Sequence, residues 1–516
     1  MGRVFERAAV TELTGETLRA AVTGHLLGLV RKELVRPDEP GLGGDDAFRF
    51  RHILIRDAAY DALPKSERAE LHERFADWLE RVAGERLTEY EEIVAHHLEQ
   101  AHRYRTELGE SGERVERLGQ RAGSLLARSG ERALGSGDAP AAMDLLTRAI
   151  ALLPRDRRWA EAAASLGDAE FILSANGPAR LHLDEAIALA LSIGDERLEW
   201  RARVTRARIA YSTGEVFDAR LAQDAIAVLE RSGDNAGLAR AWMLVALVAF
   251  TAGDPYGGAE ATDKALQYAR SAGDKYLEGR ALAKLGDLLV YGPIGSADAL
   301  PEGERLLAQA AGDLKAAALI QASLSFLVAM RGDFDRARGM AAEALRVLEE
   351  LGLAVDAAII RFNAADFIEM PATRAGIAEA ELRASYAVLE ELDETLSLCS
   401  VAASLAEALA LQDKDDEAEH YAAIASEKAN DDDYDAQIRW RRAKALVLIH
   451  RGDLAEAEAL ARAAVDIATG TDDINMQGDC FARLAEVLAV AGRPKEAKVA
   501  LEDALARYER KGNLVA

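Results

Sequence analysis

Turns rich in glycine and aspartate recur along most of this sequence, about one every 20 residues. They form two series, each advancing by about 40 residues and each bisecting the other. Gly supplies the left-handed residue that ends a helix, and an Asp after it is placed to cap the next helix. Turn signals at such regular intervals predict that helices and turns alternate, as in a helical repeat array. The first series contains Gly137, Gly177, Gly214, Gly253, Gly292, Gly332, the region of Pro371, Asp413, Gly452 and Gly492, and the second contains Pro154, Gly194, Gly233, Gly273, Gly312, Gly352, Leu392, Asp431, Gly470 and Gly512.

The second helix of each predicted pair carries small residues at nearly constant positions. Ala337 is followed by Ala344, and Ala457 by Ala464. Stacked helices approach closely only where the facing side chains are small. Half of the residues are hydrophobic but only 6% are aromatic, which suits Ala- and Leu-rich helices and disfavours extensive β structure. We therefore predict an all-α fold with about ten helical hairpins between residues 118 and 512.

Two short segments resemble the signatures of tetratricopeptide (TPR) repeats. They are Ala281–Gly286 (ALAKLG), similar to the first-helix signature, and Gly332–Ala337 (GDFDRA), similar to the second-helix signature. The period of about 40 residues exceeds the roughly 34 residues of that family, and is similar to the sensor domains of MalT-like transcription activators and related signalling ATPases. The resemblance implies a right-handed superhelix, or solenoid, whose first helices line a concave surface.

The first 117 residues do not follow this period. Their pattern predicts one or two helices over residues 14–32, a strand over 33–36, a Gly-rich loop over 37–47 and a returning strand over 48–51. Helices followed by a hairpin suggest a winged helix. Further helices are expected over residues 52–63, 65–82 and 89–105. We predict a winged-helix-like segment over residues 1–62, a helical connector over 63–117 and a TPR-like repeat array over 118–516.

The most specific segment is Phe48–Pro64 (FRFRHILIRDAAYDALP), followed by Arg68–His72 (RAELH). It resembles the stretch that follows the nucleotide-binding domain in bacterial AAA-like or STAND-type signalling ATPases, often in proteins that also carry a class III adenylate or guanylate cyclase domain. In such proteins it joins a winged-helix arm to a repeat array. This sequence contains neither the G-x-x-x-x-G-K-[ST] loop that cradles phosphates nor a cyclase domain. We interpret the chain as the carboxyl portion of such an architecture.

A row of side chains in this segment suits docking. Arg56 lies one helical turn beyond His52, and Tyr60 lies one turn beyond Arg56. Such a row favours contact with another element through hydrogen bonds and stacking over acid-base catalysis. We predict docking to a nucleotide-binding domain, in cis or in trans, through Phe50, Arg51, His52, Arg56, Asp57 and Tyr60.

Charge and composition disfavour several classes of function. The formal net charge of −25 over 516 residues opposes bulk binding of nucleic acids. Two cysteines, Cys399 and Cys480, are too few for a disulfide framework and fit a reducing cytoplasm. The chain also lacks an apolar run of the roughly 20 residues that span a bilayer, so no membrane partner is expected.

Candidate chemistry is sparse. His97 and His102 could approach one helix face, but their spacing is poor for a metal, so we interpret them as packing or surface residues. No Ser-His-Asp or Cys-His arrangement can be assigned, and the carboxylates are evenly spread. We expect no cofactor, no metal and no enzymatic activity in this chain.

The predicted winged helix raises DNA binding as an alternative. Cations that could touch phosphates are Arg31, Lys32, Arg36, Arg49 and Arg51. Acidic residues in the same hairpin would repel the DNA backbone, namely Asp38, Glu39, Asp45 and Asp46. We therefore expect an intramolecular role for this module.

Three arginines occupy one phase of successive first helices. Counting seven residues beyond Gly194, Gly233 and Gly273 leads to the candidate groove residues, Arg201, Arg240 and Arg280. A cationic ladder of this kind would hold an acidic peptide or a phosphorylated ligand through bidentate contacts. The competing interpretation is that each arginine pairs with a carboxylate of an adjacent repeat.

The sequence thus predicts a non-catalytic sensor and protein-interaction arm of a STAND-type or cyclase-associated signalling ATPase. A protein or peptide ligand would bind in the repeat groove. Alternatives are a free-standing TPR scaffold, a DNA-binding regulator acting through the winged helix, and an enzyme hidden in the N-terminal region around His52.

Overall fold

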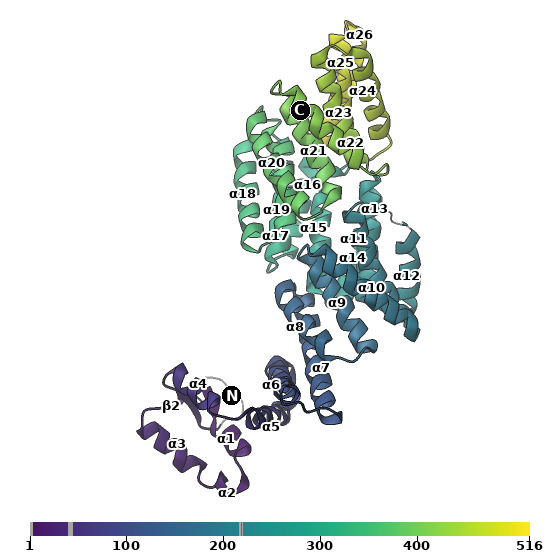
Figure 1. The fold of residues 1–516 in the computed structure, drawn as a ribbon. Coiled ribbons are helices and arrows are strands. Elements are labelled where there is room, and N and C mark those ends of the chain that lie inside the picture. The colour runs from purple at the N-terminus through teal and green to yellow at the C-terminus, as the bar shows by residue number, and fades with distance from the viewer. Residues whose placement is uncertain (1–3, 40–44, 216–217, 219) are drawn as a thin grey trace. The chain divides into compact units, whose positions relative to one another are not determined.

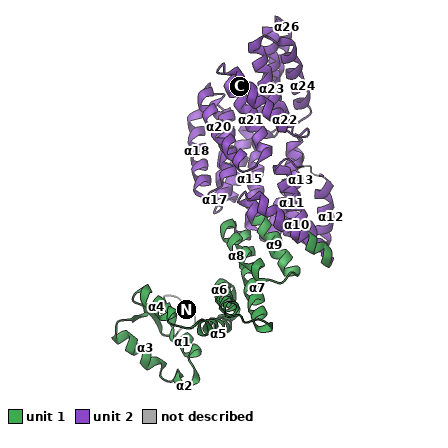
Figure 2. Ribbon diagram, viewed as in Figure 1, with its two compact units in different colours: residues 1–134, 138–169, 188–193 green, residues 135–137, 170–187, 194–516 purple. Residues whose placement is uncertain are grey.

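The structure, a computed structural model, describes residues 4–39, 45–215, 218 and 220–516. Helices dominate it, as the sequence predicts (Figure 1). The chain forms two compact units (Figure 2). Unit 1 comprises residues 1–134, 138–169 and 188–193, and unit 2 comprises residues 135–137, 170–187 and 194–516.

Unit 1 begins with a small sheet and four short helices. The elements are β1 (Val4–Glu6), α1 (Arg7–Leu13), α2 (Glu16–Arg19), α3 (Val22–Arg31), β2 (Val35–Asp38), β3 (Ala47–Phe50) and α4 (Ile53–Asp61). The sheet is antiparallel, with β3 between β1 and β2. Phe5, Val35 and Phe48 are buried with Val22 and Leu26 of α3, so one face of the sheet packs on this helix.

The strands differ slightly from the predicted ones. The predicted strands over residues 33–36 and 48–51 correspond to β2 and β3, shifted by one or two residues. The sequence pattern missed β1, because three residues are too few to show the alternation that marks a strand. The predicted loop over 37–47 is shorter, since β2 extends to Asp38, and residues 40–44 lie outside the described residues.

Two long helices follow in unit 1, α5 (Lys65–Ala83) and α6 (Leu87–Glu107), joined by the 3-10 turn η1 (Gly84–Arg86). They pack against each other through buried small and apolar residues such as Ala76, Leu98 and Ala101. The predicted helices over 65–82 and 89–105 agree closely with α5 and α6. Pro64 directly precedes α5, where its missing N–H costs no hydrogen bond.

From α7 onward the helices alternate in pairs, and ten consecutive pairs can be followed within the described residues. None of the described helices is both long and apolar enough to cross a lipid bilayer. The helices are α7 (Glu113–Ser136), α8 (Ala139–Leu152), α9 (Arg157–Ile172), α10 (Asn176–Ile193), α11 (Glu196–Ser212), α12 (Arg220–Ser232), α13 (Asn235–Thr251), α14 (Pro255–Ala272), α15 (Lys275–Tyr291), α16 (Ser296–Gln309), α17 (Leu314–Met330), α18 (Phe334–Glu350), α19 (Ala354–Ala364) continued by the π-helical η2 (Ala365–Glu369), α20 (Ala375–Glu391), α21 (Thr395–Ala410), α22 (Asp415–Lys428), α23 (Tyr434–Arg451), α24 (Leu454–Thr469), α25 (Ile474–Val490) and α26 (Pro494–Lys511).

The turns between these helices confirm most of the predicted turn positions. Gly253 and Gly273 have φ angles of 79° and 68°, in the left-handed region. The Asp274 carboxylate then accepts the backbone N–H of Leu277 at 2.9 Å and caps α15. The same capping recurs at the start of most later first helices.

Some predicted turn positions are wrong. Gly177 lies inside the first turn of α10, and the left-handed residue before it is Ser174, with φ of 61°. Gly292 does end α15 at the predicted turn, but in an extended rather than a left-handed conformation. At two turns that lack a glycine, Thr373 and Asp393 adopt the left-handed conformation at φ of 59° and 55°.

The hairpins of unit 2 form a right-handed superhelix of TPR-like repeats. First helices of successive hairpins contact one another, as α15 does α17 and α21 does α23. Second helices pack on them through small residues, since Ala337 and Ala344 of α18 are buried where it meets α17. Helix stacking therefore follows the predicted positions of alanine.

Successive turns of the superhelix contact each other within unit 2. Asn176 Nδ2 donates to the carbonyl oxygen of Leu392, 216 residues further on, at 3.5 Å. The backbone N–H of Asp472 donates to the Gly253 carbonyl at 3.0 Å. The buried Lys511 donates from Nζ to the Gly292 carbonyl at 2.6 Å, across 219 residues. One superhelical turn thus takes a little over five repeats of about 40 residues.

Candidate functional site

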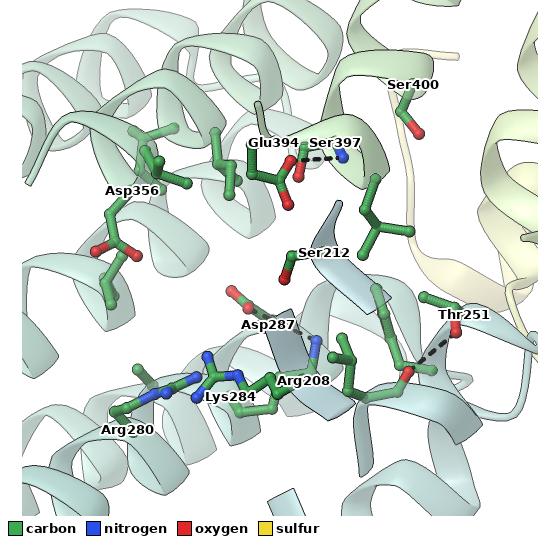
Figure 3. A pocket seen from close by; sticks show the side chains of 18 of the residues that line it. Arg208, Ser212, Thr251, Arg280, Lys284, Asp287, Asp356, Glu394, Ser397 and Ser400 are labelled. Carbon is green, nitrogen blue, oxygen red and sulfur yellow. Dashed lines mark hydrogen bonds and ion pairs between the residues drawn. The ribbon is translucent and has the colours of Figure 1, made fainter. Parts of the chain in front are cut away.

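Unit 2 contains a cavity of about 370 Å³ on the inner face of its superhelix. Lining residues come from the end of α9, the start of α10, from α11, α13, α15, α17, α19 and α21, and from the start of α23. Figure 3 shows polar side chains from several of these helices around one space. Nine helices contribute to the lining and eight of them are first helices of their hairpins, which makes this cavity the candidate ligand site.

One side of the cavity is cationic. We call three side chains of α11 and α15 the cationic wall: Arg208, Arg280 and Lys284 (Figure 3). The Lys284 Nζ lies 3.5 Å from the centroid of the Phe250 ring and 4.0 Å from Asp287 Oδ2. The Arg280 guanidinium lies 5.8 Å from the Tyr276 ring centroid, and within the described residues it forms no ion pair. Burial lowers the pKa of Lys284, and the Asp287 carboxylate opposes this effect only in part.

Two carboxyl groups occupy the starts of α21 and α23, and we call them the acidic caps. Glu394 accepts the backbone N–H of Ser397 at 2.8 Å, and Asp433 accepts that of Ala436 at 3.3 Å. Figure 3 places Glu394 across the cavity from Arg280 and Lys284. Burial raises the pKa of each cap to about 7, and neither forms an ion pair with any described residue. The caps therefore lack a basic partner.

Other charged groups of the cavity are already compensated. Lys315 Nζ lies 2.7 Å from Asp356 Oδ2. Asp287 accepts the Ser323 hydroxyl at 3.1 Å. Among the described residues, Arg280 and the two acidic caps are lining groups that form no ion pair.

The three arginines of the predicted ladder have different surroundings. They lie on α11, α13 and α15, and of these only Arg280 lines the cavity. The Arg240 guanidinium lies 3.9 Å from Asp274 Oδ2 in the next hairpin and donates to the Ala236 carbonyl at 3.3 Å. Arg201 lies on α11 outside the cavity lining. Arg240 thus pairs with a carboxylate of an adjacent repeat, which is the alternative to a ligand-binding ladder of arginines.

The predicted docking residues begin at the end of the sheet. Phe50 packs against Phe5, with ring centroids 5.1 Å apart. Arg51 and His52 are exposed, and Arg51 lies 3.6 Å from Glu33. His52 caps α4, since its Nδ1 accepts the backbone N–H two residues later at 3.2 Å. Phe50 is therefore partly taken up by the sheet core, whereas Arg51 and His52 stay accessible.

The remaining docking residues lie together on α4. Arg56 donates to Asp57 at 2.8 Å and lies 5.5 Å from the Tyr60 ring centroid. The Tyr60 hydroxyl is 2.8 Å from His72 Nε2 and 3.0 Å from the Tyr104 hydroxyl. Tyr60 thus fastens α4 to α5 and α6 within unit 1, a role that helical spacing could not reveal.

The histidines near α6 form a neutral, hydrogen-bonded pair. His72 Nδ1 lies 2.7 Å from His97 Nδ1. Burial lowers the pKa of His72 to about 3 and that of His97 to about 2. Over the part of the chain that the structure describes, no three His, Cys, Asp or Glu side chains are grouped to hold a metal ion.

Two arginines of the sheet region are paired with acids. Arg49 Nε donates to Asp38 Oδ2 at 2.7 Å. Arg7 Nε donates to Asp45 Oδ1 at 3.2 Å. These contacts reduce the charge that this surface offers to phosphates.

The sequence analysis missed most of the cavity residues. Lys284 stands in the apolar first-helix segment ALAKLG, and Glu407 stands in a similar segment of α21. Glu407 accepts from Arg442 at 3.0 Å and from Arg483 at 2.8 Å beside a second cavity of about 250 Å³. A charged residue on the buried side of a first helix is the signal that could have found both. The acidic caps gave no such signal, because capping alone explains them.

Comparisons with known proteins agree with the repeat fold. No family model and no curated protein matches this sequence. The chain is similar to a Rap protein complexed with competence and sporulation factor, with a TM-score of 0.52 and 11% identity, over 69% of this chain and 99% of that chain. It is also similar to the Cut9–Hcn1 hetero-tetramer of the APC/C, with a TM-score of 0.47 and 12% identity, over 88% of this chain and 89% of that chain. The likeness to the Rap protein shows a TPR-like helical repeat fold.

Proposed function

We propose that this chain is the non-catalytic sensor and protein-interaction arm of a STAND-type or cyclase-associated signalling ATPase. The observation that carries the proposal is the cavity of unit 2, because residues of nine helices converge on it and its lining residues Arg280, Glu394 and Asp433 form no ion pair with any described residue. A repeat superhelix that binds a ligand along its inner face can change its winding. The Rap protein of similar fold, complexed with competence and sporulation factor, is in keeping with such a role.

Features of unit 1 support an arm that docks a nucleotide-binding domain. The order strand, three helices, strand, strand, with β3 in the centre, is in keeping with a winged helix. On α4, Ile53 and Leu54 are 42% and 66% exposed beside the accessible His52. An apolar surface next to hydrogen-bonding side chains suits a protein contact. The ion pairs of Arg7 and Arg49 argue against DNA as the partner.

The proposed relation of this chain to a signalling ATPase can be tested in the source genome. A G-x-x-x-x-G-K-[ST] loop encoded in the same reading frame, or in an adjoining gene, supports the proposal. Unrelated neighbouring genes contradict it and leave a free-standing TPR scaffold as the function. A biochemical test follows from the first outcome: the purified P-loop domain should bind the chain, and Leu54→Asp should weaken that binding at least tenfold while Leu501→Asp, on the outer helix α26, should not.

A further inference from the structure

The charged groups that line the cavity are of both signs, and one of them, Lys284, already has Asp287 Oδ2 at 4.0 Å. Arg280 and Lys284 come from α15, and Glu394 and Asp433 come from the starts of α21 and α23. In the view of Figure 3, Glu394 lies on the opposite side of the lining from Arg280 and Lys284, and Asp287 is drawn between them. A ligand that carried only one charge would leave the other side of the cavity uncompensated, which is costly where water is scarce.

Each side is equipped for a specific group. A carboxylate accepts paired hydrogen bonds from a guanidinium, and Arg280 makes no ion pair with any described residue. Glu394 uses one side-chain contact to cap α21, so it retains acceptor capacity for an ammonium group. Asp433 is only 5% exposed and likewise has no basic partner among the described residues. A ligand ammonium would supply the counter-charge that these buried carboxyl groups lack.

The remaining lining narrows the ligand class. Ser212 and Ser400 also line the cavity with hydroxyl groups, and Figure 3 draws Ser212 near its middle. Hydroxyls both donate and accept, as the N–H and C=O groups of a peptide backbone require. Phe250 and Tyr291 add apolar surface for side chains. A volume of about 370 Å³ lies in the lower part of the range of small-ligand sites, so the ligand spans only a few residues.

We propose that this cavity binds a short, free-ended peptide as a zwitterion, with its terminal carboxylate at Arg280 and Lys284 and its terminal ammonium at Glu394 and Asp433. This inference rests on the proposed function, since it names the ligand class of the same sensor site. It replaces the predicted acidic or phosphorylated ligand of the arginine ladder, because Arg240 is paired with Asp274 and the cavity supplies acids as well as cations.

The test uses the full chain and a defined pool of synthetic tetrapeptides with free ends. Equilibrium dialysis followed by mass spectrometry identifies the peptides that the protein retains. Calorimetry then compares each retained peptide with its C-terminally amidated and N-terminally acetylated forms. Each modification should weaken binding by about 10- to 100-fold, the cost of losing a hydrogen bond between charged groups.

Thermodynamic cycles assign each end to its partner. Amidation of the peptide should weaken its binding to the wild type 10- to 100-fold. It should weaken binding to Arg280→Met about 3-fold or less, because that variant already lacks the guanidinium that holds the carboxylate. Acetylation should behave in the same way in Glu394→Gln. Lys284→Met repeats the first cycle if Arg280→Met does not fold, and circular dichroism checks the fold of each variant. Arg346→Met, on the outer helix α18, is the matched control and should bind like the wild type.

Three results would overturn the inference: no tetrapeptide retained by the wild type, equal binding of free and blocked peptides, or an amidation penalty that persists in Arg280→Met. These results are independent of the proposed function. If the genome encodes a P-loop domain but no peptide binds, the sensor-arm proposal is supported and the peptide inference is wrong. If a peptide binds but no P-loop domain is encoded, the peptide inference is supported and the ATPase parentage is wrong.

Discussion

Asp433 couples the stability of unit 2 to pH. Burial raises the pKa of its carboxyl group from near 4 in the unfolded chain to about 7 in the folded chain. Between those values the folded chain holds a proton that the unfolded chain has released. The stabilisation from this group is therefore fully present below about pH 4 and is lost as the pH rises through 7.

Asp433→Asn should remove this dependence. Asn is also a good N-cap, so α23 keeps its first hydrogen bond. Between pH 5 and pH 7.5, the free energy of unfolding of the variant should gain about 2 kcal/mol relative to the wild type. Urea denaturation at several pH values, followed by circular dichroism, measures the difference. Parallel curves for the two proteins would contradict the prediction.

Single residues also show why the cavity escaped sequence analysis. Arg201, Arg240 and Arg280 share one phase of the repeat, yet Arg280 alone lines the cavity. The phase of a residue fixes which side of its helix it occupies. Its partner depends on the neighbouring hairpin, which supplies Asp274 to Arg240. Equivalent positions in a repeat can therefore differ in function.

At the scale of helices, the boundaries follow from local chemistry. Asp313 caps α17 by accepting the backbone N–H of Ala316 at 3.0 Å. Asp453 occupies the same position before α24 but makes no side-chain capping bond. The two aspartates are therefore a matched pair for measuring the contribution of the cap.

Asp313→Ala should lower the free energy of unfolding by about 1 kcal/mol, the usual contribution of an N-cap. Asp453→Ala should change it by only a few tenths of a kcal/mol, because no capping bond is lost. Chemical denaturation of both variants under the same conditions provides the comparison. Equal losses would show that the side-chain bond at Asp313 contributes nothing.

The helices of the array were largely predictable because their signals are local. A left-handed residue, a capping side chain and a small residue each act within a few positions of the chain. The error at Gly177 arose because this glycine stands beside the turn without making it, whereas Gly292 ends its helix without a left-handed residue. The strand β1 was missed because its pairing with β3 joins residues over 40 positions apart.

At the scale of the whole unit, contacts between successive superhelical turns close the repeat array. A methyl group added at Gly253 would lie 2.8 Å from Thr471 Cβ, in a hairpin more than 200 residues away. Gly492 has a similar φ angle, 74° against 79°, but has open space around it. Both Gly→Ala variants carry the cost of a left-handed alanine, about 1–2 kcal/mol.

Gly253→Ala should therefore be the more destabilising variant, by a further 1–3 kcal/mol or so from overpacking. Gly492→Ala is the control for the backbone cost. Thermal and urea unfolding of both variants test the difference. If the two variants unfold alike, the inter-turn contact at Gly253 is not tight in solution.

Lys511 offers a second test of these contacts. Its buried Nζ donates to three carbonyl groups around the end of α15, those of Leu289, Gly292 and Ile294. Lys511→Met should leave these acceptors unsatisfied and lower the free energy of unfolding by about 2–3 kcal/mol. Amide hydrogen exchange over residues 289–296 should become faster. Lys498→Met, at an exposed position of the same helix, should change neither measurement.

The sequence by itself determined the repeat: its period, its helices, its turns and its capping residues, because each depends on interactions within a few residues. The tertiary structure decided how many repeats make one turn and therefore which residues meet across it. Small rotations between hairpins add up over more than 200 residues, and no local pattern encodes their sum. Glu394 and Asp433 line one cavity with Arg280 and Lys284 for that reason, and no single motif in the sequence predicts the cavity.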